Sequence, residues 1–158
     1  WVYFIFHINF FLNYLQSFVI QGNVLYFVEI INKQTIMETD EIASKLVAWC
    51  NEGDFEKPYQ QLYSDKIVSI ENDGKAEGAY VEGFEGIKKK GEWWQENFEV
   101  HSSKASDPVV ADNWFSVKFT MDTTHKPSGQ RSTMSEIAVY EVQDGKIVKE
   151  QFFYDDKG

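Results

Sequence analysis

Apolar and polar residues alternate with a period of two through the last third of the chain, which is the pattern of half-buried β-strands. Stretches rich in Asp, Asn, Gly and Pro, typical of turns, divide this region into four predicted strands, at 98–106, 114–125, 131–141 and 147–154. The last two strands flank Asp144-Gly145, a strong hairpin signal. The pattern therefore predicts an antiparallel meander that buries one of its faces.

The residues before the meander repeat with helical spacing, and they predict three helices. The first begins at Thr39-Asp40, whose side chains can cap a helix, and ends at Gly53. The second covers 55–63 and the third covers 84–97, with a strand at 66–71 between them. This order predicts the α+β class, in which about three helices pack on one face of a curved antiparallel sheet.

Residues 1–36 differ in composition from the rest of the chain. They are dense in Phe, Ile, Leu, Tyr and Asn, and their formal charges are Glu29 and Lys33, so the whole net charge of −10 lies in 37–158. Three interpretations of this head are open: a non-native translation of upstream sequence, a membrane segment, or a genuine soluble extension. The residue bias and a first methionine at Met37 favour the non-native interpretation, with a domain at 37–158 and a cytoplasmic location.

Composition narrows the function classes that 37–158 could serve. The chain is 43% hydrophobic and 16% aromatic, enough to bury a core and to line a small-molecule cavity. Its acidic balance argues against nucleic acid and against anionic membranes as partners. The single cysteine, Cys50, excludes an internal disulfide. Because the spacing of His, Cys, Asp and Glu matches no metal motif, we expect neither a metal ion nor a cofactor.

The order of elements and three motifs resemble the SnoaL-like group of the nuclear transport factor 2-like superfamily over 39–155. The motifs are LYSDKIVSIE, GIKKKGEWW and AVYEVQDGKIVKEQFF. The resemblance implies a cone-shaped half-barrel of the cystatin-like type around an apolar cavity. It also implies a homodimer through the outer sheet face, because many members associate in this way. Members include cyclases, isomerases, dehydratases, binding domains and association modules, so the fold alone does not give the function.

The resemblance also draws attention to the end of the last strand. Related cyclases carry a His-Trp-Asp run there, whose Asp acts as acid and base. This chain has Glu150, Gln151 and Phe152 at the matching positions, so Phe152 replaces that acid. The cyclase mechanism is therefore not supported residue by residue.

Strand parity offers a second route to a site. With a loop of Gln143-Asp144-Gly145 and a bulge at Gly145, Glu136 faces Phe152, and one strand face carries Met134, Glu136, Ala138, Tyr140, Glu150, Phe152 and Tyr154. A two-residue Asp144-Gly145 loop instead shifts the register by one and separates Glu136 from Glu150. Two carboxylates among aromatic rings would lose water and repel each other, which raises the pKa of at least one of them. Such an acid could serve as a general base near neutral pH.

We expect Glu136 to be the leading base, Tyr154 or Tyr140 to donate a hydrogen bond, and His101 to act as a proton shuttle. The expected ligand contacts come from the second and third predicted helices and the last two predicted strands: Trp94, Tyr63, Met134, Tyr140, Glu150 and Phe152. The alternative for His101 is a hydrogen-bonded histidine on a strand. The alternative for both glutamates is a charge at the rim, paired with Lys149, Arg131 or Lys118.

Two function classes follow. The first is a small-molecule pocket, including a cofactor-free proton-transfer enzyme of the isomerase or cyclase type on an apolar substrate. The second is a non-catalytic ligand-binding or dimeric association module whose cavity is filled by its own aromatic side chains. The run Lys88-Lys89-Lys90 is interpreted as a solvated helix face under either class.

Overall fold

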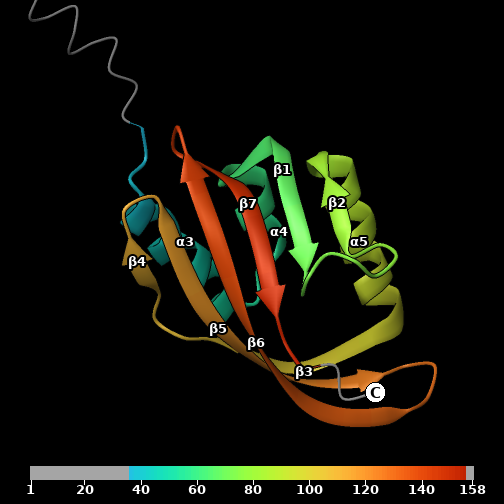
Figure 1. Cartoon of the computed structure of the whole chain (residues 1–158). Coiled ribbons are helices and arrows are strands. Elements are labelled where there is room, and N and C mark those ends of the chain that lie inside the picture. Colours follow the sequence, from blue (N-terminus) through green and yellow to red (C-terminus); the bar gives the residue numbers. More distant parts are fainter. Residues whose placement is uncertain (1–35, 156–158) are drawn as a thin grey trace, which may run out of the picture. The chain divides into compact units, whose positions relative to one another are not determined.

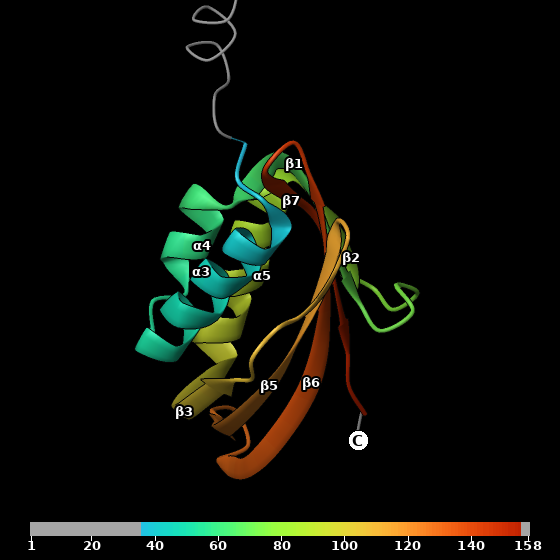
Figure 2. The same cartoon turned by 90° about the vertical axis from the view of Figure 1, so that its left-hand side faces the viewer.

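The computed structural model describes residues 36–155, so the interpretations of the head lie almost wholly outside the described part of the chain. Helices and strands follow one another as α3 (Thr39–Glu52), α4 (Glu56–Gln61), β1 (Tyr63–Glu71), β2 (Tyr80–Glu82), α5 (Gly83–Asn97), β3 (Phe98–Ala105), β4 (Val109–Ala111), β5 (Trp114–His125), β6 (Gln130–Gln143) and β7 (Lys146–Phe153). The three helices lie on one side of a single curved sheet (Figure 1). Figure 2 shows the same two layers from the side. No helix in the described range is both long and apolar enough to cross a membrane.

The sheet confirms the predicted α+β class and adds one feature to it. Its strands lie in the order β2-β1-β7-β6-β5-β3, and β4 pairs with β5. Every pair is antiparallel except β1 with β7, which run parallel and make the sheet mixed. This pair places the first strand of the domain beside the last, so that Ser69 lies next to Glu150.

The β6–β7 hairpin combines the two loop alternatives that the sequence leaves open. Asp144 and Gly145 form a two-residue loop with φ angles of 51° and 73°, which suits a turn of the I′ type. The register then shifts between Glu141 and Val142, a β-bulge that restores the even pairing. The two acids therefore share the inner face as predicted, although Glu150 faces Tyr140 and Phe152 faces Ala138, two residues from the expected partners.

The core fills the space between the helices and the inner sheet face. α3 contributes the predicted stripe that includes Ile42, Leu46 and Cys50, and the sheet contributes buried aliphatic and aromatic side chains. Phe115 and Tyr140 stack with ring centroids 4.6 Å apart in this interior. The cap predicted at Thr39-Asp40 is wrong by one residue, since Glu38 is the N-cap and no side chain caps it.

Two glycines in the helical layer differ in backbone conformation, so their replacement by alanine should have opposite effects on stability. Gly53 ends α3 with φ of +82°, whereas Gly91 lies inside α5, and a Cβ added at either would meet no atom within 4 Å. We therefore expect Gly53→Ala to destabilise the fold by about 1 kcal/mol through backbone strain, and Gly91→Ala to stabilise it by ~0.5–1 kcal/mol. Urea unfolding of both variants checks this. Equal effects at the two positions would contradict it.

Candidate functional site

A buried carboxylate lies where β7 meets β1. Glu150 is only 1% exposed. The Tyr63 hydroxyl donates to its Oε2 at 2.6 Å, and the Ser69 hydroxyl donates to its Oε1 at 2.7 Å. Each carboxylate oxygen therefore has a strong hydrogen-bond donor, as a buried acid requires.

The ammonium group of Lys90, on α5, reaches the buried cluster that Glu150 forms with Tyr63 and Ser69. It donates to Ser69 Oγ at 2.8 Å, lies 3.9 Å from Glu150 Oε1 and forms an ion pair with Glu71. It also lies 4.3 Å from the centroid of the Phe152 ring, a cation–π contact. The interpretation of the lysine run as a solvated face is therefore wrong for Lys90, whose side chain is only 27% exposed.

These charges shift the protonation of the inner acids. Burial raises the pKa of Glu150, against the lowering by Lys90 and by the two donated hydrogen bonds. Burial raises the pKa of Glu136 to about 7; repulsion by Glu71 and Glu150 adds to the rise, and Lys90 opposes it. Burial and Glu150 together hold the pKa of Tyr63 well above its ordinary value, so its hydroxyl stays a donor.

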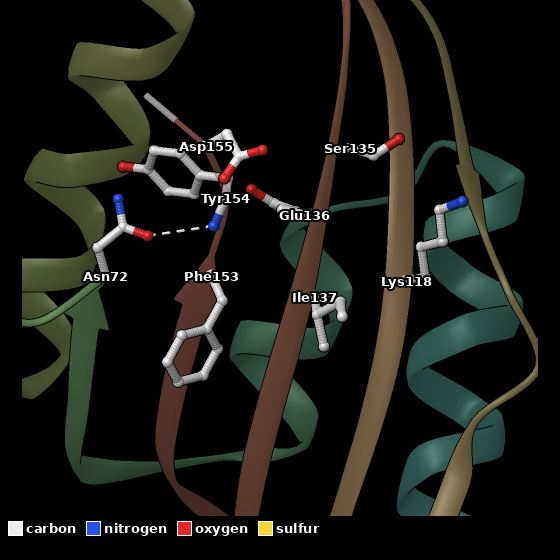
Figure 3. A pocket seen from close by; sticks show the side chains of 8 residues that line it. All are labelled: Asn72, Lys118, Ser135, Glu136, Ile137, Phe153, Tyr154 and Asp155. Atoms are coloured by element: carbon white, nitrogen blue, oxygen red, sulfur yellow. Dashed lines mark hydrogen bonds between the residues drawn. The ribbon is translucent and has the colours of Figure 1, made fainter. Parts of the chain in front are cut away.

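Glu136 borders an open hollow at the end of β7. The hairpin pairing ends at Ile137 and Phe153, so β6 continues past β7 at this point. The hollow has a volume of about 570 Å³ and is lined by Asn72, Lys118, Ser135, Glu136, Ile137, Phe153, Tyr154 and Asp155. Figure 3 shows the Glu136 carboxylate turned toward the end of β7, where Tyr154 and Asp155 lie. Glu136 is thus accessible from solvent through this hollow, whereas Glu150 is fully buried.

The structure brings two of the three predicted catalytic residues to this hollow. Glu136 and Tyr154 both line it, and the Tyr154 backbone N–H donates to Asn72 Oδ1 at 3.1 Å. In Figure 3 the Tyr154 hydroxyl points away from Glu136. His101 lies elsewhere: it is exposed, with Nε2 2.7 Å from Thr124 Oγ1. The alternative of a hydrogen-bonded strand histidine describes His101, since its contact is to a strand neighbour.

The six residues predicted to contact a ligand lie in three different places. Tyr63, Tyr140 and Glu150 are buried in the core, and Phe152 is half-buried beside them. Met134 is half-buried opposite Met121. Trp94 stacks on Phe98 with centroids 4.2 Å apart at the end of α5. None of these six residues lines the hollow, which is therefore a different surface from the apolar cavity that was predicted.

Two of the basic residues considered as partners of the glutamates, Arg131 and Lys118, have different surroundings. Arg131 pairs with Asp122 through Nε and Nη2, at 2.9 and 2.6 Å, so its partner is not one of the two glutamates. Lys118 lines the hollow together with Glu136.

Three residues of the cluster are absent from the predicted site: Ser69, Glu71 and Lys90. Ile67, Ser69 and Glu71 occupy every second position of β1, so the two polar residues share the face of the buried Ile67. That alternation was the available signal, but the parallel pairing with β7 has no local sequence cue. Within 36–155, no group of three or more His, Cys, Asp or Glu side chains is arranged to hold a metal ion.

Comparison with known proteins gives one family. Residues 37–154 match the model of the SnoaL-like domain. A solved structure from Mesorhizobium loti, named "putative SnoaL-like polyketide cyclase" with the added words "carbohydrate phosphatase", is 36% identical, with a TM-score of 0.70. The match covers 75% of this chain and 100% of that one. No curated protein matches the chain.

More distant structures share the fold alone. A "putative polyketide cyclase" from Pseudomonas putida is 19% identical over 76% of this chain and 93% of that one, with a TM-score of 0.59. A "putative isomerase" from Bacillus subtilis is 21% identical over 74% and 86% of the two chains, with a TM-score of 0.56. A structure from Xanthomonas campestris is described as having a cystatin-like fold, at 17% identity, 77% and 93% coverage and a TM-score of 0.61.

Two tyrosines make the same bond in different surroundings, and they provide a matched test of the buried acid. Tyr63 donates to buried Glu150, whereas Tyr80, which is 50% exposed, donates to Glu82 on the surface. We expect Tyr63→Phe to lower the free energy of unfolding by about 1.5–3 kcal/mol, because a buried carboxylate loses a donor. Tyr80→Phe should be indistinguishable from the wild type. Urea unfolding near pH 7 measures both, and a Tyr63→Phe effect no larger than that of Tyr80→Phe would contradict the account.

Proposed function

Because this chain belongs to the SnoaL-like domain family, we propose that it is a cofactor-free enzyme that moves a proton on a small carbonyl compound, with Glu136 as the general base. The observation that carries this proposal is the position of Glu136. It lies on the buried face of β6, and it also borders a hollow that is open to the outside (Figure 3). Glu150 lies on the same face but is sealed, so Glu136 is the one of the two acids that a ligand can meet.

The protonation of Glu136 suits such a role. A pKa of about 7 means that the carboxyl is about half ionised near neutral pH. It can therefore accept a proton from a substrate and return it in the same turnover. The cause is burial together with the nearby Glu71 and Glu150, which makes the basicity a property of the fold.

The hollow fits a small molecule with an apolar body. Its volume of about 570 Å³ falls in the usual range for small-molecule sites, ~300–1,000 Å³. Ile137 and Phe153 offer apolar surface beside Glu136, and both are partly exposed. Asn72 and Lys118 bring an amide and an ammonium group, which suit a carbonyl oxygen that gains negative charge.

The reaction is a proton transfer at carbon. The Glu136 carboxylate removes a proton from the carbon next to the carbonyl, and the electron pair of that C–H bond moves onto the carbonyl oxygen to form an enolate. The protonated Glu136 then returns the proton to the same carbon or to another carbon of the enolate. Exchange with solvent follows when the Glu136 proton is replaced before it is returned.

We expect the protein to exchange the acidic C–H protons of 2-tetralone and of ethyl 2-oxocyclohexanecarboxylate for deuterium in D₂O, followed by ¹H NMR. The rate should rise as the pH increases through about 7, because only the ionised carboxylate can act as a base. Glu136→Gln should lower the protein-catalysed rate by about 10²-fold or more.

Glu99→Gln is the matched control, because it removes an exposed carboxyl from β3 and leaves the hollow intact. It should exchange both compounds at the wild-type rate. Equal rates for wild type and Glu136→Gln, or no exchange above the buffer rate for either compound, would overturn the proposed activity.

A second candidate function is a dimeric association module, and the outer sheet face favours it. Ile137 and Phe153 are neighbours across the β6–β7 pair and are 51% and 44% exposed. The interior meanwhile contains its own aromatic side chains, including the stacked Phe115 and Tyr140. A second copy that covered Ile137 and Phe153 would remove apolar surface from water and form a homodimer through the outer sheet face.

Light scattering after size-exclusion chromatography tests this association. If the outer face forms the interface, the wild type elutes as a dimer and the double variant Ile137→Ser/Phe153→Ser elutes as a monomer. The variant Val109→Ser, which removes an exposed apolar residue from β4, should leave the dimer intact. A monomeric wild type, or a double variant that stays dimeric, would exclude this interface.

A further inference from the structure

We propose that Lys90 is a positioning residue: its ammonium group pairs with Glu71 and Glu150 and leaves Glu136 as the acid that exchanges protons at the hollow. The inference deepens the proposed function and takes Glu136 as its base. Its readout is the protonation of Glu136, which can be measured without a substrate.

The geometry centres on the ring of Phe152. Glu71 lies beside Phe152 on β1, and Ala138 lies beside it on β6, so the three residues form one row across the sheet. Glu150 and Glu136 are the next inner-face residues along β7 and β6. Lys90 lies over the Phe152 ring, so its ammonium group lies between the acids of β1 and β7, Glu71 and Glu150.

The Lys90 ammonium group interacts with three carboxyl groups, and it lies closer to two of them than to the third. Within the described part of the chain, the ion pairs of Lys90 go to Glu71 and Glu150. Its hydrogen bond to Ser69 Oγ extends this link, because Ser69 donates in turn to Glu150. Glu136 interacts with Lys90 at longer range and meets the outside instead.

Glu136 therefore responds to charges from every element around it. Glu71 on β1 and Glu150 on β7 favour its neutral form, and Lys90 on α5 favours its ionised form. In the hollow, Lys118 from β5 and Asp155 beyond β7 add one charge of each sign. Since Lys90 and Glu71 act in opposite directions on Glu136, removing each should move its protonation in opposite directions.

The experiment follows the Glu136 carboxyl by ¹³C NMR titration in the full chain, with the resonance assigned by its loss in Glu136→Gln. Lys90→Met should raise the midpoint of Glu136 by about one pH unit, because its attractive charge is lost while Glu71 and Glu150 remain. Glu71→Gln should lower the midpoint, because a repelling charge is lost. Lys90→Arg keeps the charge and should restore the wild-type midpoint.

Lys89→Met is the matched control, because Lys89 is the exposed neighbour of Lys90 in the same helix. It should leave the midpoint unchanged. If Lys90→Met does not fold, Lys90→Gln takes its place, with the same expected rise in the midpoint. Midpoint changes of the same sign in Lys90→Met and Glu71→Gln, or a shift in Lys89→Met as large as in Lys90→Met, would overturn the role of Lys90.

The same variants separate this inference from the proposed activity. If the midpoints move as expected but neither carbonyl compound exchanges, the role of Lys90 stands and the proposed enzyme fails. If exchange occurs but the midpoint of Glu136 is unchanged in Lys90→Met and in Glu71→Gln, the proposed activity stands and the positioning role of Lys90 fails. If both hold, the pH dependence of exchange should shift with the NMR midpoint in each variant.

Discussion

The interior of this domain is organised by one constraint, a carboxylate that is removed from water. A buried charge is costly unless hydrogen bonds and an opposite charge compensate it, and Glu150 has both. Tyr63 and Ser69 supply the hydrogen bonds from β1, and Lys90 supplies the charge from α5. The cluster therefore joins a helix to the parallel β1–β7 pair, and its geometry requires all three elements to be in place.

The same constraint creates a difference between two acids that share one face. Glu150 has its partners and is sealed, whereas Glu136 lies where β6 extends past the last pair with β7 and a hollow opens beside it. Burial, together with the negative charges of Glu71 and Glu150, raises the pKa of Glu136, and the hollow gives it access to a ligand. The proposed base catalysis by Glu136 rests on this arrangement of a buried charge cluster behind an accessible acid.

Much of the fold followed from local sequence patterns, and much of the site did not. Alternation and the Asp144-Gly145 turn placed Glu136 and Glu150 on one face. The loop is shorter than expected, and a bulge between Glu141 and Val142, in place of the one expected at Gly145, restores that parity. Lys90 belongs to a run of three lysines, so a solvated helix face was the natural interpretation. Its contact with acids on β1 and β7 depends on long-range packing, which local periodicity does not encode.

The pH dependence of stability tests most directly whether Glu136 is a desolvated acid. Its pKa is about 7 in the folded protein against an ordinary 4.5, so the stability it contributes is complete below about pH 4.5 and is lost as the pH rises through 7. Glutamine does not ionise. Urea unfolding should therefore give equal free energies for wild type and Glu136→Gln near pH 4.5, and a variant that is more stable by up to about 3 kcal/mol near pH 8. Parallel pH curves would show that Glu136 is an ordinary surface carboxylate.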